Sequence, residues 1–187
     1  MVPLPIPLDL PHTLVYRLSV GLLDDAIDQR LPVVDTAGNA PSPFVGAVRL
    51  AVAAPAPDEQ PPPGDAAIRL AGAEFAPSWP AGSEQTVTLR WFAAEVVSTD
   101  YTVFLHLRDD AGQLVAQADG PPLAGWYPTS WWAPGDWVVD DHSFTLPPTL
   151  SPGNYHLVAG LYDPLSGQRL GEEQPLGTVE IVAGDRP

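Results

Sequence analysis

The sequence contains no cysteine and no lysine among its 187 residues. The absence of cysteine excludes disulfides, thiolate zinc sites and a cysteine nucleophile, and it leaves the compartment open. No uninterrupted apolar run reaches the roughly 18 residues that span a bilayer, and residues 1–10 lack the basic start and continuous apolar stretch of a signal peptide. A location outside the cytoplasm therefore requires a targeting signal on a longer parent chain.

Positive charge is scarce. The eight basic residues are all arginine, against 23 acidic residues, which gives a formal net charge of −15 and a pI near 4.2. A nucleic-acid-binding protein needs a cationic face to displace counterions, and no basic cluster exists here. Attraction to an anionic membrane surface is excluded for the same reason. We expect the acidic surplus to keep the surface soluble and self-repelling, with cation collection as the alternative.

Hydrophobic residues make up 45% of the chain, and 24 prolines and 16 glycines interrupt it. That composition favours a packed core of short strands joined by turns. Residues 85–91 alternate strictly, with Val87, Leu89 and Trp91 on one side. We predict an all-β fold, an antiparallel two-sheet sandwich that is immunoglobulin-like, with a jelly roll as the alternative. The predicted strands are 67–72, 85–91, 101–108, 113–119, 137–146, 154–162 and 178–183.

The chain contains half of an internal repeat. Residues 16–31 and 155–170 are identical at eight of sixteen positions without gaps, and the match resumes at 45–48 against 176–179. Agreement of strand, turn and following strand together indicates a repeated unit. We therefore interpret 1–52 as the C-terminal half of a preceding sandwich repeat, 53–66 as a proline-rich acidic linker, and 67–187 as the complete domain.

Strands that lack their own partners recruit other strands. We therefore hypothesise that residues 1–52 pair with the complete domain, or with a neighbouring chain by strand addition.

The predicted long loop at 120–136 is unusually aromatic. Exposed aromatic rings stack on the apolar faces of sugars, and neighbouring carboxylates accept hydrogen bonds from hydroxyl groups. Three interpretations remain open: a glycan-binding surface, a buried plug over one end of the sandwich, and a protein contact. The candidate residues are Trp126, Tyr127, Trp131, Trp132, Trp137 and Asp136, with Asp140 and Asp141 nearby.

Several strings carry a family resemblance. They are Trp91, 101–107, 125–130, 132–136, 153–155, 160–163 and 167–170, in this order. Together they resemble the soluble sandwich domains of large multi-pass membrane proteins from Chloroflexus-like bacteria, described as glycosyltransferase-like, of the mannosyltransferase class. The resemblance covers about residues 67–183, and residues 1–52 as the tail of a preceding copy.

This resemblance implies an extracytoplasmic module at the cell surface, which meets the membrane only through a parent chain. It carries no catalytic residue onto this sequence, because the transmembrane helices and catalytic acids of such a transferase are missing. The expected function is therefore that of a spacer or a glycan- or protein-binding appendage.

No catalytic set is expected. His106 is predicted to approach Asp119 on a paired strand, but Ser130 lies in the loop and no G-x-S-x-G elbow exists. We expect a structural hydrogen bond there. The glutamates that a glycoside hydrolase would need lie at predicted strand ends or in loops: Glu74, Glu84, Glu95, Glu172 and Glu173. The protein is therefore expected not to be an enzyme.

No cofactor is expected, with calcium as a weak alternative because sandwiches often bind it through loop oxygens. The carboxylates available for it are Asp109, Asp110, Asp140, Asp141 and Asp163, and the string D-x-[DN]-x-[DN]-G is absent. Asp163 and its counterpart Asp24 are expected to cap turns instead.

Overall fold

A computed structural model describes residues 14–19, 23–24, 29–30, 44–50 and 60–184 of the chain. The chain divides into two compact units, Met1–Val52 and Ala53–Pro187, and each is described by itself. Within the linker predicted at 53–66, residues 53–59 lie outside the described residues.

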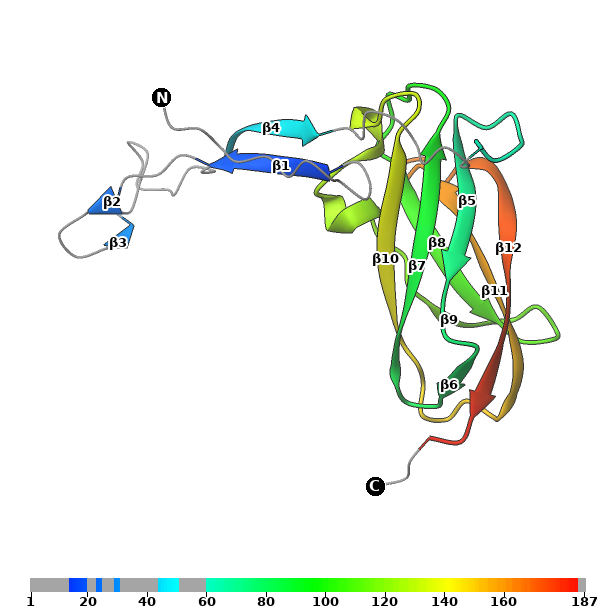
Figure 1. Cartoon of the computed structure of the whole chain (residues 1–187). Helices are drawn as coiled ribbons and strands as arrows, with labels where there is room; N and C mark the ends of the chain where they lie inside the picture. The colour runs from blue at the N-terminus through cyan, green and yellow to red at the C-terminus, as the bar shows by residue number, and fades with distance from the viewer. Residues whose placement is uncertain (1–13, 20–22, 25–28, 31–43, 51–59, 185–187) are drawn as a thin grey trace. The chain divides into compact units, whose positions relative to one another are not determined.

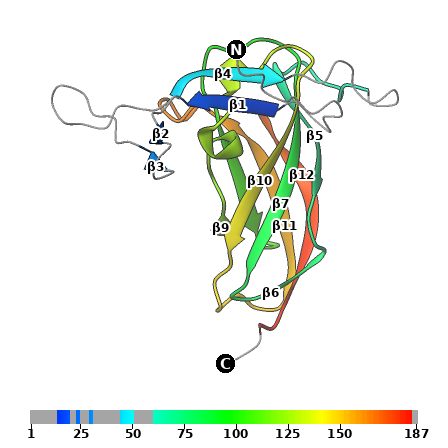
Figure 2. The ribbon, with the colours of Figure 1, turned by 60° about the vertical axis from the view of Figure 1, so that its left-hand side comes forward.

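The second unit consists of two facing β-sheets (Figure 1; Figure 2). The three-stranded sheet has the order β10 (Trp137–Thr145), β7 (Glu84–Ala93), β5 (Ile68–Glu74). The five-stranded sheet has the order β6 (Ser78–Pro80), β12 (Arg169–Val182), β11 (Gly153–Tyr162), β8 (Thr102–Arg108), β9 (Leu114–Gln117). Neighbouring strands are antiparallel, except that β6 runs parallel to β12.

This strand order is immunoglobulin-like. In chain order, β5, β7 and β10 correspond to strands A, B and E of one sheet, and β8, β11 and β12 to C, F and G of the other. The predicted two-sheet β-sandwich is therefore confirmed, and the jelly-roll alternative does not describe this topology.

The core follows from the alternation of apolar residues along the strands. Val87 and Leu89 of β7 are fully buried, as are Val103, Leu105 and Leu107 of β8. Successive side chains of a strand point to opposite faces, so these residues meet between the two sheets.

The largest fully buried side chain is Trp79 of β6, whose ring centroid lies 5.5 Å from that of Phe144. Strand β6 was not predicted, because its three residues, Ser78–Pro80, are too few to show an alternation. Strand β12 also begins earlier than predicted, at Arg169 rather than at residue 178.

One glycine shared by the two repeat copies has a packing reason. A Cβ on Gly160 would lie 2.5 Å from the Phe104 ring, so that the ring fits only against a glycine. Phe104 is buried on the outer face of its sheet, and the Arg169 guanidinium covers its ring at 4.7 Å. This close approach accounts for the glycine at position 160 of the second copy.

The first unit repeats the strand register of β11 and β12. Strand β1 (Leu14–Ser19) pairs antiparallel with β4 (Phe44–Leu50), and Tyr16 lies opposite Val48. The repeat alignment maps these two positions onto Tyr155 and Val179, which also lie opposite each other.

The short strands β2 (Leu23–Asp24) and β3 (Gln29–Arg30) extend this correspondence. Leu23 pairs with Arg30, as Tyr162 pairs with Arg169 in the second unit. In the second unit β11 lies between β12 and β8, whereas the described part of the first unit gives β1 a single partner strand, β4.

The described end of the predicted linker folds onto the second unit. The Arg69 guanidinium donates from Nε to the carbonyl of Ala66 and from Nη1 to that of Pro62, each at 3.0 Å. These two hydrogen bonds tie residues 62–66 to the start of β5. Within the described residues, no helix is long and apolar enough to cross a membrane.

Candidate functional site

The aromatic loop between β9 and β10 divides into buried and exposed rings. It contains two short 3₁₀ helices, η1 (Pro122–Gly125) and η2 (Thr129–Trp131). Tyr127 and Trp132 are 1% and 2% exposed, whereas Trp126 and Trp131 are 51% and 50% exposed. The loop is thus a plug with two tryptophans on its surface.

The buried half of the loop is held by Asp136, which is 2% exposed. Its Oδ2 accepts hydrogen bonds from the Tyr127 hydroxyl at 2.7 Å and from the Ala133 amide at 2.9 Å. The Trp132 indole donates to the carbonyl of Tyr127 at 3.0 Å. Asp136, Tyr127 and Trp132 therefore support the loop from within and do not face solvent.

Thr129 ties η2 to the segment before β8. Its hydroxyl donates to the carbonyl of Thr99 at 2.7 Å and accepts from the amide of Tyr101 at 2.8 Å. Because Thr129 is fully buried, these bonds fix the backbone that carries Trp131.

The other end of the loop rests on a buried contact between His142 and Asp140. His142 Nε2 lies 2.6 Å from Asp140 Oδ2, and Asp140 Oδ1 accepts from the Leu123 amide at 2.7 Å. Leu123 and Ala124 have φ angles of 50° and 52°, a left-handed conformation that costs non-glycine residues energy. The hydrogen bond to Asp140 holds this strained turn, which leads into Trp126.

The fifth candidate ring, Trp137, begins strand β10. It packs against Phe92 with ring centroids 5.0 Å apart, and the Arg90 guanidinium lies 5.5 Å from its ring. Trp137 is half-buried and belongs to the outer face of the three-stranded sheet. Asp141 lies further along the same strand. It is exposed and accepts a hydrogen bond from the Thr88 hydroxyl at 2.6 Å.

The structure brings His106 and Asp119 together, as the sequence predicts. His106 Nε2 lies 3.4 Å from Asp119 Oδ1, which also accepts from the Leu105 amide at 3.3 Å. The ring of His106 packs against Phe104 with centroids 5.1 Å apart. These contacts suit a structural pair that fastens the edge strand β9 to β8.

The aspartates considered for calcium are dispersed. Asp110 lies 3.1 Å from His156, and Asp109 accepts the Ala111 and Gln113 amides in its turn. Asp163 caps the turn after β11, where the Ser166 hydroxyl and the Leu165 amide lower the pKa of its carboxyl group. Among the described residues, no group of three or more His, Asp or Glu side chains is placed to hold a metal ion.

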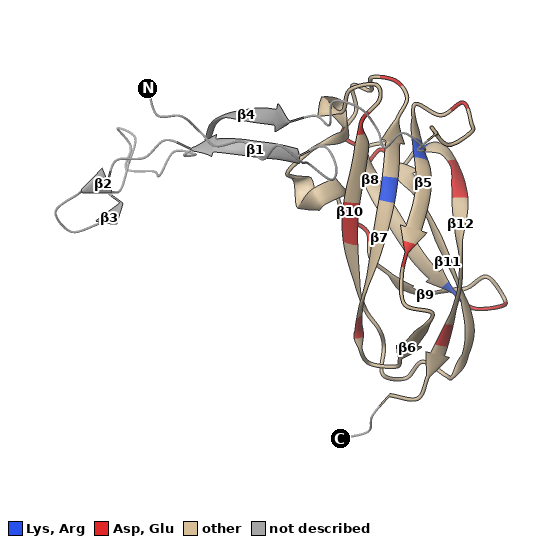
Figure 3. Cartoon of the chain, in the orientation of Figure 1, with Lys and Arg blue, Asp and Glu red and all other residues tan. Residues whose placement is uncertain are grey.

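Charge on the second unit is mostly negative. Figure 3 shows acidic residues along both sheets and in the turns, with few basic residues between them. One cluster contains both basic and acidic side chains. Arg108 donates to both carboxylate oxygens of Glu173 at 2.9 and 3.0 Å, and Arg169 donates to the same carboxylate at 3.0 Å. These two guanidinium groups, Arg108 first, lower the pKa of Glu173 below its ordinary value of 4.5.

We expect acid to remove the contribution of Glu173 to stability. A carboxylate whose pKa is lowered by folding stabilises the protein above its unfolded pKa and loses that effect as pH falls through the folded value. The free energy of unfolding of Glu173→Gln should be lower than that of the native protein by about 1 kcal/mol at pH 7. This difference should shrink below pH 4.5, as urea denaturation at a series of pH values would show. A difference that stays constant down to pH 2.5 would contradict this assignment.

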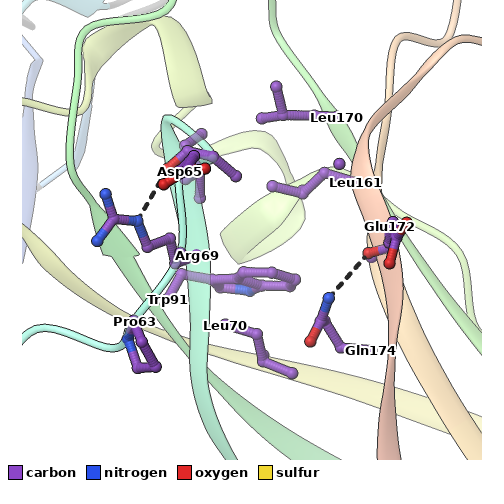
Figure 4. A pocket seen from close by; sticks show the side chains of 14 residues that line it. Pro63, Asp65, Arg69, Leu70, Trp91, Leu161, Leu170, Glu172 and Gln174 are labelled. Atoms are coloured by element: carbon purple, nitrogen blue, oxygen red, sulfur yellow. Dashed lines mark hydrogen bonds between the residues drawn. The ribbon is translucent and has the colours of Figure 1, made fainter.

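A pocket on the second unit was not predicted from the sequence. It lies between β5 and β12, with Trp91 of β7 among its lining residues, and it has a volume of about 400 Å³ (Figure 4). Its polar lining comes from Asp65, Arg69, Glu172 and Gln174, which are far apart in the sequence. No sequence motif includes these four residues, so the sequence alone does not indicate the pocket.

No family model matches the chain, and no curated protein matches it. Solved structures do resemble it. The C-terminal domain of wzt aligns with a TM-score of 0.51 and 11% identity over 65% of this chain and 77% of that one. A CARDB domain from Pyrococcus furiosus, solved in complex with di-metal ions, aligns with a TM-score of 0.40 and 11% identity, over 62% of this chain and 87% of that one. The likeness to the wzt domain shows a shared β-sandwich fold.

Proposed function

We propose that this chain is a non-catalytic, extracytoplasmic β-sandwich module that binds glycan through Trp126 and Trp131. The observation that carries the proposal is the half-exposure of both indoles on a loop whose interior is fixed by buried hydrogen bonds. Large exposed aromatic rings cost hydration free energy, and rings held in place lose little entropy when they stack on a sugar.

The wider setting rests on the family resemblance. The strings around Trp91, 125–136 and 153–170 support placement as an appendage of a membrane glycosyltransferase-like protein. In that setting the module extends from the membrane surface and meets glycan there. A spacer without any ligand is the plain alternative.

The exposed tryptophans provide a direct test of glycan binding. The native protein is expected to bind at least one neutral oligosaccharide on a glycan array, and Trp131→Ala or Trp126→Ala should weaken that binding at least tenfold. Each variant should keep the native unfolding temperature within about 2 °C, since an exposed ring adds little to folding stability. Leu165→Ala is the matched control, because Leu165 is 96% exposed on a different turn.

Binding that survives both tryptophan substitutions would place the glycan elsewhere on the module. A blank array would favour the spacer.

A second function, self-association by strand addition, is favoured by the register of the first unit. Strand β1 copies β11 but pairs only with β4 among the described residues, whereas β11 has partners on both sides. An unpaired strand edge presents a row of backbone donors and acceptors to another strand.

We expect sedimentation to give a mass that rises with protein concentration, and the amides of residues 14–19 to become better protected from hydrogen exchange as the concentration rises. A monomer at all concentrations, with exchange at these amides independent of concentration, would rule out strand addition.

A further inference from the structure

The pocket between β5 and β12 lies where both flanking strands depart from regular pairing. In β5, Leu70 pairs with Trp91 and Gly72 with Arg90, so Ala71 is an extra residue. In β12, Gln174 pairs with Ala159 and Leu170 with Leu161, so three residues of β12 oppose Gly160 alone. Bulges of this kind bend the strand and re-aim its side chains, and here they open the edge of the sandwich.

The bulge of β12 is anchored from outside the pocket. Glu173 is bound by Arg108 and Arg169 on the outer face of the sheet. Its neighbours Glu172 and Gln174 line the pocket, and Gln174 Nε2 also donates to the carbonyl of Glu172 at 3.1 Å. The ion pair therefore holds the strand segment that supplies one polar wall.

The opposite wall is equally fixed. Arg69 bonds the carbonyls of Pro62 and Ala66, and this contact holds the segment 63–66, which lines the pocket beside it. Figure 4 shows the Trp91 indole between Arg69 on one side and Glu172 and Gln174 on the other. The pocket is thus preformed, with an aromatic ring between two polar walls.

The indole N–H of Trp91 makes no hydrogen bond within the described residues. Trp91 is 2% exposed, and its Nε1 is buried. Trp79 Nε1 shares this property but does not line the pocket. Trp91 therefore belongs to the buried part of the pocket lining, and its Nε1–H signal is a probe of what enters the pocket.

The lining selects the chemical class of the ligand. Two carboxylates, Asp65 and Glu172, face one guanidinium, Arg69, which already spends two donors on the protein; this disfavours an anion. Three charged groups disfavour a purely apolar ligand. A neutral molecule with hydroxyl groups around an apolar face suits both the polar walls and the half-buried side chains of Leu70 and Leu170.

We propose that this pocket binds the terminal one or two rings of a neutral glycan, with the apolar face of a ring against Leu70 and Leu170 and hydroxyl groups on Asp65, Glu172 and Gln174. The inference rests on the proposed glycan-binding role and adds to the loop tryptophans a second site. A volume of about 400 Å³ lies within the range of about 300–1,000 Å³ that small-molecule pockets occupy.

The test is a titration of the ¹⁵N-labelled full chain with methyl glycosides of neutral hexoses and their disaccharides. The six tryptophans give separate indole N–H signals, and Trp91→Phe and Trp131→Phe assign two of them. We expect at least one glycoside to shift the Trp91 signal. Glu172→Ala, and Gln174→Trp, which fills the pocket mouth, should each weaken that binding at least tenfold.

Two control variants separate the sites. Glu180→Ala removes an exposed glutamate of the same strand outside the pocket, and Trp131→Ala removes a loop ring. Both should leave the shift of Trp91 unchanged. A shift of the Trp131 signal without one of the Trp91 signal would overturn the pocket proposal and leave the loop as the glycan site. No shift with any glycoside would overturn both, and a shift of Trp91 by a peptide or an anionic sugar alone would overturn the ligand class.

Discussion

Replacement of His142 by alanine is expected to lower the free energy of unfolding by about 3–5 kcal/mol, the usual cost of leaving a buried carboxylate without its partner. Asp140 is 1% exposed, and after the substitution its carboxylate keeps the hydrogen bond from the Leu123 amide at 2.7 Å but loses the one to the imidazole. His142 Nδ1 also lies 3.0 Å from the carbonyl of Ala118, so the variant loses the tie between β10 and the end of β9. Urea denaturation measures the effect.

The other histidine–aspartate pairs provide matched controls with graded burial. The side chains of His142 and Asp140 are 7% and 0% exposed, those of His106 and Asp119 are 17% and 23%, and those of His156 and Asp110 are 49% and 82%. The destabilisation should follow this order, with His156→Ala close to neutral. Equal effects at all three positions would show that burial of the pair does not determine its contribution.

Replacement of Asp136 by alanine is expected to cost about 2–4 kcal/mol and to loosen the aromatic loop. The Tyr127 hydroxyl and the Ala133 amide, at 2.7 and 2.9 Å, would each lose a charged acceptor inside the protein. Because Tyr127 and Trp132 pack beneath the exposed rings, the loss of this carboxylate should also abolish glycan binding.

Asp141→Ala is the control for Asp136, because Asp141 is an exposed aspartate with one hydroxyl partner, Thr88. It should change the free energy of unfolding by less than about 1 kcal/mol. If Asp136→Ala proved as mild as Asp141→Ala, the loop would not depend on its buried carboxylate.

The strands could be predicted where apolar residues alternate. Residues 85–91 and 101–108 became β7 and β8 with the expected inward side chains. Strand β6 could not be predicted, since its place is decided by burial of Trp79 against Phe144 rather than by local pattern. The early start of β12 was hidden by its bulge, because the two extra residues between Leu170 and Gln174 break the period-two pattern.

The site was predictable only in part. The sequence locates the aromatic loop but cannot tell Trp126 and Trp131, which are exposed, from Tyr127 and Trp132, which are buried. That distinction depends on the acceptor supplied by Asp136 and on the turn held by Asp140. The pocket depends on two bulges in strands about a hundred residues apart, which no local motif encodes.

The repeat is the clearest link between sequence and structure in this protein. The pairs Tyr16–Val48 and Tyr155–Val179 lie opposite each other in their own hairpins, as the aligned sequences require. Strand register is set by which side chains share a face, so a repeated pattern of side chains repeats the register.

The most direct test of the proposed glycan-binding function is the quenching of tryptophan fluorescence by acrylamide, with and without neutral oligosaccharides. Trp126 and Trp131 are half-exposed, whereas Trp79, Trp91 and Trp132 are at most 2% exposed. We expect part of the tryptophan fluorescence to be readily quenched and this part to be lost when Trp126 and Trp131 are replaced by phenylalanine. At least one neutral oligosaccharide should protect it from quenching. A readily quenched fraction that no oligosaccharide protects would contradict the proposed function and leave the module a spacer.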